Sequence, residues 1–149
     1  MDTHAQICFA SPLASEAESG TSGIKDRVLD EERKGVVYEV PCTDCSAVNI
    51  GETLRTVTAR VKEHQRDTER GCLERSALAA HSHFCNNRIA WKGAKILCQE
   101  QRWDARKTKE ALMISNAAGI GQVLNTDSGW KMHPAWQDVV RLAFNSTSI

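Results

Sequence analysis

Hydrophobic and polar positions divide the chain into three parts. Residues 1–33 alternate small, polar and acidic side chains without an apolar period, which predicts a disordered acidic N-terminal arm. Residues 34–128 carry strand-like and helix-like periods and are expected to form the folded domain. Residues 129–149 are typical of a C-terminal tail, in which residues 134–144 are expected to form a short helix.

The folded part opens with two strand-like runs that predict a β-hairpin. Residues 36–40 are mostly β-branched, and Pro41 ends this run because proline has no N–H to donate to a strand ladder. Residues 47–50 predict the second strand, which a turn at Gly51 is expected to end. A short loop joins the two runs, so a hairpin is the simplest arrangement.

Helical spacing follows the hairpin. A first helix is predicted over residues 56–70, because apolar side chains and a histidine recur on one stripe and Gly71 supplies a C-terminal stop. The stripe consists of Leu54, Val57, Val61 and His64. The later elements are a helix at 73–83, a strand at 94–99 and a helix at 103–116. This order predicts a small α/β (α+β) domain with a three-stranded, mainly antiparallel sheet flanked by helices.

Composition and charge narrow the class of protein. Apolar residues make up 41% of the 149 residues, enough for a modest core, and no apolar run reaches membrane-spanning length. The N-terminus has no apolar secretory segment, so we expect an intracellular protein without a membrane partner. Residues 1–32 hold seven acidic and two basic side chains, whereas residues 33–110 hold 15 basic and 10 acidic ones. This asymmetry favours a nucleic-acid partner, with an ordinary solvated surface as the alternative.

Four side chains in the folded part suit phosphodiester hydrolysis. Arg60 presents a planar fork that matches two phosphate oxygens, and Glu110 suits Mg²⁺, which takes few carboxylates together with water and phosphate. Tyr38 can orient the attacking water, or deprotonate it if a nearby cation, either Arg60 or the metal ion with its waters, favours the phenolate. His64 follows Arg60 by four residues, so both face one cleft, where His64 orients the phosphate or relays a proton.

Taken singly, each of these residues also has a structural interpretation. Arg60 suits a solvated helix surface, His64 a partly buried stripe, and Tyr38 the core side of a strand. Glu110 can form an ion pair with Arg106, four residues earlier on the same helix. Only the joint order and spacing favour a catalytic site.

Order and spacing together resemble the GIY-YIG endonuclease family over residues 35–127. The resemblance rests on the tyrosine-bearing first strand, the Ile50-Gly51 turn, Arg60 and His64 on a helix, Glu110, and finally Asn125. Taken alone, the asparagine in LNTD would be an ordinary turn residue. The Cys-x-x-Cys loop and the phrases VVY and IGET resemble the endonuclease domain of Penelope-like retroelements.

This resemblance implies a nuclease function and a set of site residues. It implies a divalent-metal-dependent DNA endonuclease of a transposable element that nicks one strand, acts in the nucleus, and takes no small-molecule substrate. It also implies Mg²⁺ (or Mn²⁺) as the cofactor, held by Glu110. The catalytic residues that it implies are Tyr38, Asn49, Gly51, Arg60, His64, Glu110 and Asn125.

One position departs from the family pattern. The second motif half of the family carries a tyrosine where this chain has Asn49, and an asparagine cannot act as a base at neutral pH. If the second tyrosine is the general base, its loss typically costs ~10²–10⁴ in rate, whereas if Tyr38 is the base, Asn49 only weakens the positioning of water. The alternative to an active nuclease is therefore a catalytically inactive, zinc-stabilised DNA-binding module or a transposon relic.

Cysteines form a second candidate site. Cys42 and Cys45 have the spacing of a zinc knuckle, in which two thiolates share one tetrahedral ion. Further ligand types occur in the stretch HSHFC, which contains His81, His83 and Cys85. The alternative interpretation is that the cysteines are reduced loop thiols and the histidines lie on the surface at a helix end.

The Penelope-like resemblance implies two histidine ligands downstream of the Cys-x-x-Cys loop. His81 fits the first of them, and Asn87 occupies the position of the second. Because asparagine is a poor zinc ligand, we expect Cys85 as the fourth ligand, with His83 as the alternative.

Overall fold

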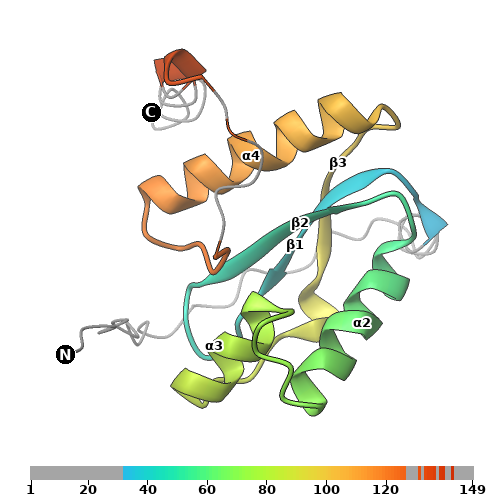
Figure 1. Ribbon diagram of the computed structural model, residues 1–149, viewed down its shortest axis with the longest axis vertical. Coiled ribbons are helices and arrows are strands. Elements are labelled where there is room, and N and C mark those ends of the chain that lie inside the picture. The colour runs from blue at the N-terminus through green and yellow to red at the C-terminus, as the bar shows by residue number, and fades with distance from the viewer. Residues whose placement is uncertain (1–31, 127–130, 132, 137, 140–141, 143–149) are drawn as a thin grey trace, which may run out of the picture.

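A three-stranded antiparallel sheet forms the centre of the fold and carries helices on both faces (Figure 1). The computed structural model of the chain describes residues 32–126, 131, 133–136, 138–139 and 142. The strands are β1 (Val36–Pro41), β2 (Val48–Thr53) and β3 (Lys95–Gln99), in the spatial order β2-β1-β3, with β1 antiparallel to both neighbours. This confirms the predicted α+β fold with a small antiparallel sheet.

Helices α2 (Val57–Glu69) and α3 (Ala77–Cys85) cover one face of the sheet, and α4 (Trp103–Gly119) covers the other (Figure 1). A single 3-10 turn, η1 (Trp91–Gly93), precedes β3. The strictly alternating side chains of β1 divide the core between the two faces. Tyr38 and its alternate neighbours pack against α2 and α3, whereas Val37 packs with Ile114 of α4.

Strand β2 is longer than the sequence suggested. Gly51 does not end the strand in a turn, because β2 continues through it to Thr53 and pairs it with Tyr38 of β1. A Cβ atom at Gly51 would lie 2.7 Å from the Tyr38 hydroxyl oxygen. The glycine is therefore needed for the space that the tyrosine ring occupies, and the prediction of a glycine turn here was wrong.

Side-chain caps determine where the helices on this face begin. Thr56 caps α2 by accepting a hydrogen bond from the N–H of Ala59, and Gly71, with a φ of +68°, follows the end of the helix as predicted. Leu54 was expected on the buried stripe, but it precedes the cap and is 59% exposed. The second helix was expected from Leu73. It begins at Ala77 instead, because Ser76 is its N-cap.

Several predictions fall partly or wholly on residues that the structure does not describe. The predicted disordered arm lies outside the described residues up to residue 31. Within the predicted C-terminal helix at 134–144, the described residues Ala135, Trp136, Asp138, Val139 and Leu142 are helical. Among the described residues, no helix combines the length and the apolar character needed to cross a membrane.

Candidate active site and metal site

Tyr38 lies at the centre of the residues predicted to be catalytic. Its side chain is 1% exposed, and its ring extends across Gly51 on the face of the sheet covered by α2. The hydroxyl oxygen lies 3.1 Å from Nε2 of His64, which α2 presents to the sheet. The structure therefore brings Tyr38, Gly51 and His64 together.

His64 is held through both of its ring nitrogens. Its Nδ1 lies 3.0 Å from the hydroxyl oxygen of Ser76, and its Nε2 contacts Tyr38. Ser76 also caps α3 by accepting from the N–H of Ala79, so one hydroxyl joins the start of α3 to the ring of His64. Ser76 was not identified as a site residue from the sequence, although a serine directly before an apolar helical run is a recognisable N-cap signal.

Burial determines the protonation of this pair. It lowers the pKa of His64 to about 4, assisted by the positive charge of Arg60, so the imidazole is neutral at pH 7. Burial likewise raises the pKa of Tyr38 to about 12, although Arg60 acts in the opposite direction. The expectation that a nearby guanidinium could make Tyr38 a phenolate base does not hold for this arrangement, because desolvation outweighs the cation.

Arg60 lies half-buried on α2, beside the tyrosine. Its Nη1 donates a 2.7 Å hydrogen bond to Oε2 of Glu63. Glu63 also accepts from the exposed Arg55, and these hydrogen bonds to the two arginines lower the pKa of Glu63 to about 2. The charge of Arg60 acts on both Tyr38 and His64, which places its guanidinium at the same cluster.

Glu110 lies on α4, which covers the other face of the sheet, and its charge acts on Tyr38. It is 8% exposed, burial raises the pKa of its carboxyl group, and its negative charge contributes to the raised pKa of Tyr38. We call Tyr38, Arg60, His64 and Glu110 the tyrosine cluster. These four residues come from β1, α2 and α4.

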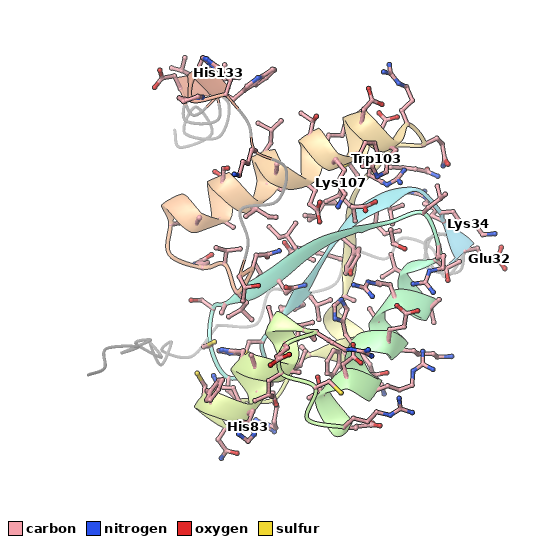
Figure 2. All side chains as sticks on the ribbon, viewed as in Figure 1. Glu32, Lys34, His83, Trp103, Lys107 and His133 are labelled. Atoms are coloured by element: carbon pink, nitrogen blue, oxygen red, sulfur yellow. The ribbon has the colours of Figure 1, made fainter. Side chains whose placement is uncertain are left out.

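A lysine links Glu110 to a second carboxylate. Nζ of Lys107 lies 3.1 Å from Oε2 of Glu110 and 3.1 Å from Oε1 of Glu52 on β2. Figure 2 shows Lys107 on the side of α4 that faces the sheet. Burial alone would raise the pKa of Glu52, but its bonds to Arg106 and Lys107 lower it.

The alternative ion pair between Glu110 and Arg106 is not formed. Arg106 is 2% exposed, and its Nε donates to Oε2 of Glu52 at 2.6 Å. Its Nη1 donates to the backbone carbonyls of residues 100 and 101. Glu52 and Lys107 were not identified from the sequence, because their proximity depends on how α4 packs on β2.

Two asparagines of the predicted set occupy different surroundings. Asn49 is 7% exposed and lies opposite Val40, so it shares a face with Tyr38 and Gly51. The amide of Asn125 instead bonds the backbone of Ile50 in both directions: its Oδ1 accepts from N at 2.9 Å and its Nδ2 donates to O at 2.6 Å. Asn125 thus fixes the segment after α4 to the outer edge of β2.

The cysteine cluster, Cys42, Cys45 and His81, forms a second group of potential ligands. One ligand atom of each residue lies within 4.8 Å of the other two, so the group can hold a metal ion. Sγ of Cys45 lies 3.5 Å from Nε2 of His81. Burial lowers the pKa of His81 and favours the neutral imidazole that metals bind. Nδ1 of His81 is the one buried side-chain nitrogen or oxygen among the described residues without a hydrogen-bond partner.

The fourth ligand position is not filled by a residue of the predicted set. Cys85 is not part of the cluster, and His83 is exposed on α3, directed away from the sheet (Figure 2). Asn87 lies at the cluster instead, with its Nδ2 3.4 Å from Nε2 of His81. The structure thus brings together three of the four predicted zinc ligands and places an amide beside them.

Comparison with known proteins identifies no relative. No protein-family model matches the sequence, no curated protein matches it, and no solved structure matches it. The two clusters are therefore interpreted from their own geometry.

Proposed function

We propose that the protein is a divalent-metal-dependent DNA endonuclease that hydrolyses a phosphodiester bond in one strand. The observation that carries this proposal is the contact between Tyr38 and His64, with the charges of Arg60 and Glu110 both acting on Tyr38. A phenol, a guanidinium, a neutral imidazole and a carboxylate can together position water, meet the charge of a phosphate and hold a cation. The motif order that resembles GIY-YIG endonucleases supports the same function.

The hydrogen bonds around His64 define a route for one proton. We assign the His64 tautomer in which Nδ1–H donates to Ser76 Oγ and Nε2 accepts from the Tyr38 hydroxyl, since Ser76 Oγ has lone pairs for both His64 and the N–H of Ala79. The phenolic oxygen then has a lone pair for an attacking water. Tyr38 takes a proton from this water as it passes its own proton to His64, whose low pKa rises once the phosphate neutralises the charge of Arg60, so no free phenolate is required.

Arg60 supplies the charge that the scissile phosphate needs. Its guanidinium now bonds Glu63, and a phosphate dianion or diester can replace that carboxylate because both accept the same planar fork. Its side chain is 35% exposed, so substrate can reach it.

The donor set at Glu110 fits a hard divalent cation. Glu52 and Glu110 already share one positive charge, the Lys107 ammonium group, at equal distances of 3.1 Å. Carboxylate oxygens are the ligands that Mg²⁺ prefers, together with water and phosphate. When bound, the ion would stabilise negative charge on the phosphate and on the leaving oxygen.

Plasmid nicking tests this proposal directly. The protein is expected to convert supercoiled plasmid to the open-circular form with Mg²⁺ but not without it, and Glu110→Gln should abolish the conversion. Asp104→Asn is the matched control, because Asp104 is an exposed carboxylate at the start of the same helix. Equal rates for wild type and Glu110→Gln would contradict the proposal.

Asn49→Tyr provides a second arm of the same assay. This substitution restores the tyrosine of the resembled motif on the face that carries Tyr38. We expect faster nicking, because a second phenol can help to orient the water. If neither wild type nor Asn49→Tyr nicks DNA, while Glu110→Ala leaves DNA affinity unchanged, the enzyme function is excluded and the DNA-binding module is supported.

We also propose that the cysteine cluster holds a structural Zn²⁺ ion. Two thiols and a neutral imidazole are ligands that zinc favours, and the ion would join the β1–β2 loop to α3. This observation also favours the second candidate function, a zinc-stabilised DNA-binding module without catalysis. Metal analysis after dialysis tests the site, and complete folding of zinc-free protein would contradict a structural role.

A further inference from the structure

A groove of about 630 Å³ lies between α2, η1 and β3, on the opposite flank of α2 from Arg60. From α2 it is lined by residues at the i, i+3 and i+7 spacing of one helix face, namely Thr58, Val61 and Gln65. Arg60 and Glu63 lie on the other flank, where the tyrosine cluster is. The groove is therefore separate from the candidate active site.

Three lysines line this groove, and two of them lack a carboxylate partner within the part of the chain that the structure describes. Lys95 pairs with Glu39 at 2.7 Å, but among the described residues neither Lys62 nor Lys92 forms an ion pair. Both are exposed. The groove thus offers uncompensated positive charge to a ligand.

Basic side chains at α4, on the opposite face of the sheet, differ from Lys62 and Lys92 because they have carboxylate partners. The four at the start of and along α4 all pair with carboxylates: Arg102 with Asp104, Arg106 with Glu52, Lys107 with Glu52 and Glu110, and Lys109 with Glu100. Charge that is already neutralised contributes little to binding a polyanion. The charge of these four side chains is therefore already neutralised, unlike that of Lys62 and Lys92.

An aromatic ring completes the groove. Trp91 of η1 is half-buried, packs against the core with part of its surface, and lines the groove with the remainder. A tryptophan face bordered by lysines is the combination that binds single-stranded nucleic acid, because bases stack on the ring and lysines meet the phosphates. In a duplex the base faces are already stacked and are not available to such a ring.

We propose that this groove binds a segment of single-stranded nucleic acid, with Lys62 and Lys92 on its phosphates and a base stacked on Trp91. This proposal rests on the proposed function for the class of ligand, but it does not depend on the chemical step. The groove would hold a strand on the far flank of α2 from the phosphodiester that is cut.

Fluorescence anisotropy tests the charge contribution. A fluorescein-labelled oligothymidylate is titrated with the full chain without added divalent ions, beside a duplex of equal length and an oligouridylate. The double variant Lys62→Glu/Lys92→Glu should bind the oligothymidylate roughly tenfold or more weakly than wild type. The slope of the logarithm of the binding constant against the logarithm of the salt concentration should become shallower by about 1.4, because each phosphate contact on a single strand contributes about 0.7 to that slope. The control Arg102→Glu/Lys109→Glu changes net charge equally on the α4 side and should bind within about twofold of wild type.

Tryptophan fluorescence tests the stacking contribution. Oligothymidylate should quench part of the wild-type emission, and Trp91→Leu, which retains an apolar side chain against the core, should remove that part. Melting temperatures of all variants establish that they are folded. Equal loss of affinity in both double variants, tighter binding of duplex than of single strand, or unchanged quenching in Trp91→Leu would each overturn the proposal.

The same variants separate this inference from the nuclease function. If plasmid nicking fails while the Lys62/Lys92 variant loses strand binding, the nuclease function is wrong and the groove stands. If nicking depends on Glu110 while strand binding is unchanged in that variant, the groove is wrong and the nuclease function stands. Equal affinity for the DNA and RNA strands would show a general single-strand site, and a preference would identify the natural polymer.

Discussion

His64 and His81 are both buried histidines on the α2–α3 side of the sheet, but their ring nitrogens are used differently. Both nitrogens of His64 have oxygen partners, at 3.0 and 3.1 Å. His81 has no partner at Nδ1, and its Nε2 faces Cys45 and Asn87 at 3.5 and 3.4 Å. A histidine with two good oxygen partners holds its neighbours in position, whereas His81, whose Nε2 has only long contacts to a thiol and an amide, can take a metal ion there.

The different hydrogen-bond partners of the two histidines indicate different roles for the two clusters. In the tyrosine cluster, the fold itself fixes His64 and Tyr38, so the hydrogen bonds that the proposed proton relay needs are present without a ligand. In the cysteine cluster, the ligand atoms lie within reach of one another without strong mutual bonds, which is suited to a metal ion. Substitutions should therefore affect the two clusters independently.

The largest expected effect is loss of the metal from the cysteine cluster. Cys45→Ser should release all zinc that wild type retains after dialysis, because a serine hydroxyl is a poor replacement for a thiolate. Zinc content per chain, measured by atomic emission, checks this expectation. Cys72→Ser is the matched control, since Cys72 lies outside the cluster, and it should retain wild-type zinc. Equal zinc content in the two variants would mean that the cluster holds none.

A smaller effect is expected from the pH dependence contributed by His64. Its pKa is about 4 in the folded protein against 6.5 in the unfolded chain, so unfolding takes up a proton between these values. The stability that the neutral imidazole contributes is fully present above pH 6.5 and is lost as the pH falls from about 6.5 to about 4. A pKa shift of this size corresponds to a change of about 3 kcal/mol in the free energy of unfolding.

Urea denaturation at several pH values measures this contribution. The free energy of unfolding of wild type should decline more steeply below pH 6.5 than that of His64→Gln. His83→Gln is the control, because His83 is exposed, and it should follow wild type. Parallel curves for wild type and His64→Gln would show that His64 is not held neutral.

The smallest expected effect concerns Lys107 and the Mg²⁺ site that we propose at Glu110. Lys107→Met removes the ammonium group between Glu52 and Glu110, so Mg²⁺ should bind about tenfold more tightly, equivalent to about 1.4 kcal/mol. Titration calorimetry with Mg²⁺ alone checks this without an activity assay. Lys109→Met, which breaks only the pair with Glu100, should leave the affinity unchanged. Weaker binding in Lys107→Met would exclude competition between the lysine and the ion.

Local signals in the sequence predicted much of the fold. β-branched runs predicted β1, and the glycine after Arg70 predicted the end of α2, because these effects depend only on neighbouring residues. Gly51 was misinterpreted because its role depends on the Tyr38 ring that crosses it from the next strand. Sequence gives no direct information about such a tertiary contact.

At the candidate sites, too, the sequence predicted residues but not the tertiary contacts between them. Motif spacing identified Tyr38, His64, Cys42, Cys45 and His81, which the structure brings into two clusters. The pKa of Tyr38 was expected to be open to lowering by Arg60, and burial reverses that direction. Lys107 and Glu52 were missed because they meet only when α4 packs on β2.

The most direct test of the account is the nicking rate of Tyr38→Phe, measured together with its zinc content. Phenylalanine keeps the buried ring over Gly51 and removes only the hydroxyl that contacts His64. We predict that Mg²⁺-dependent nicking falls roughly 10²–10⁴-fold while zinc content stays at the wild-type value. Nicking at the wild-type rate would contradict the assignment of Tyr38 to the chemical step.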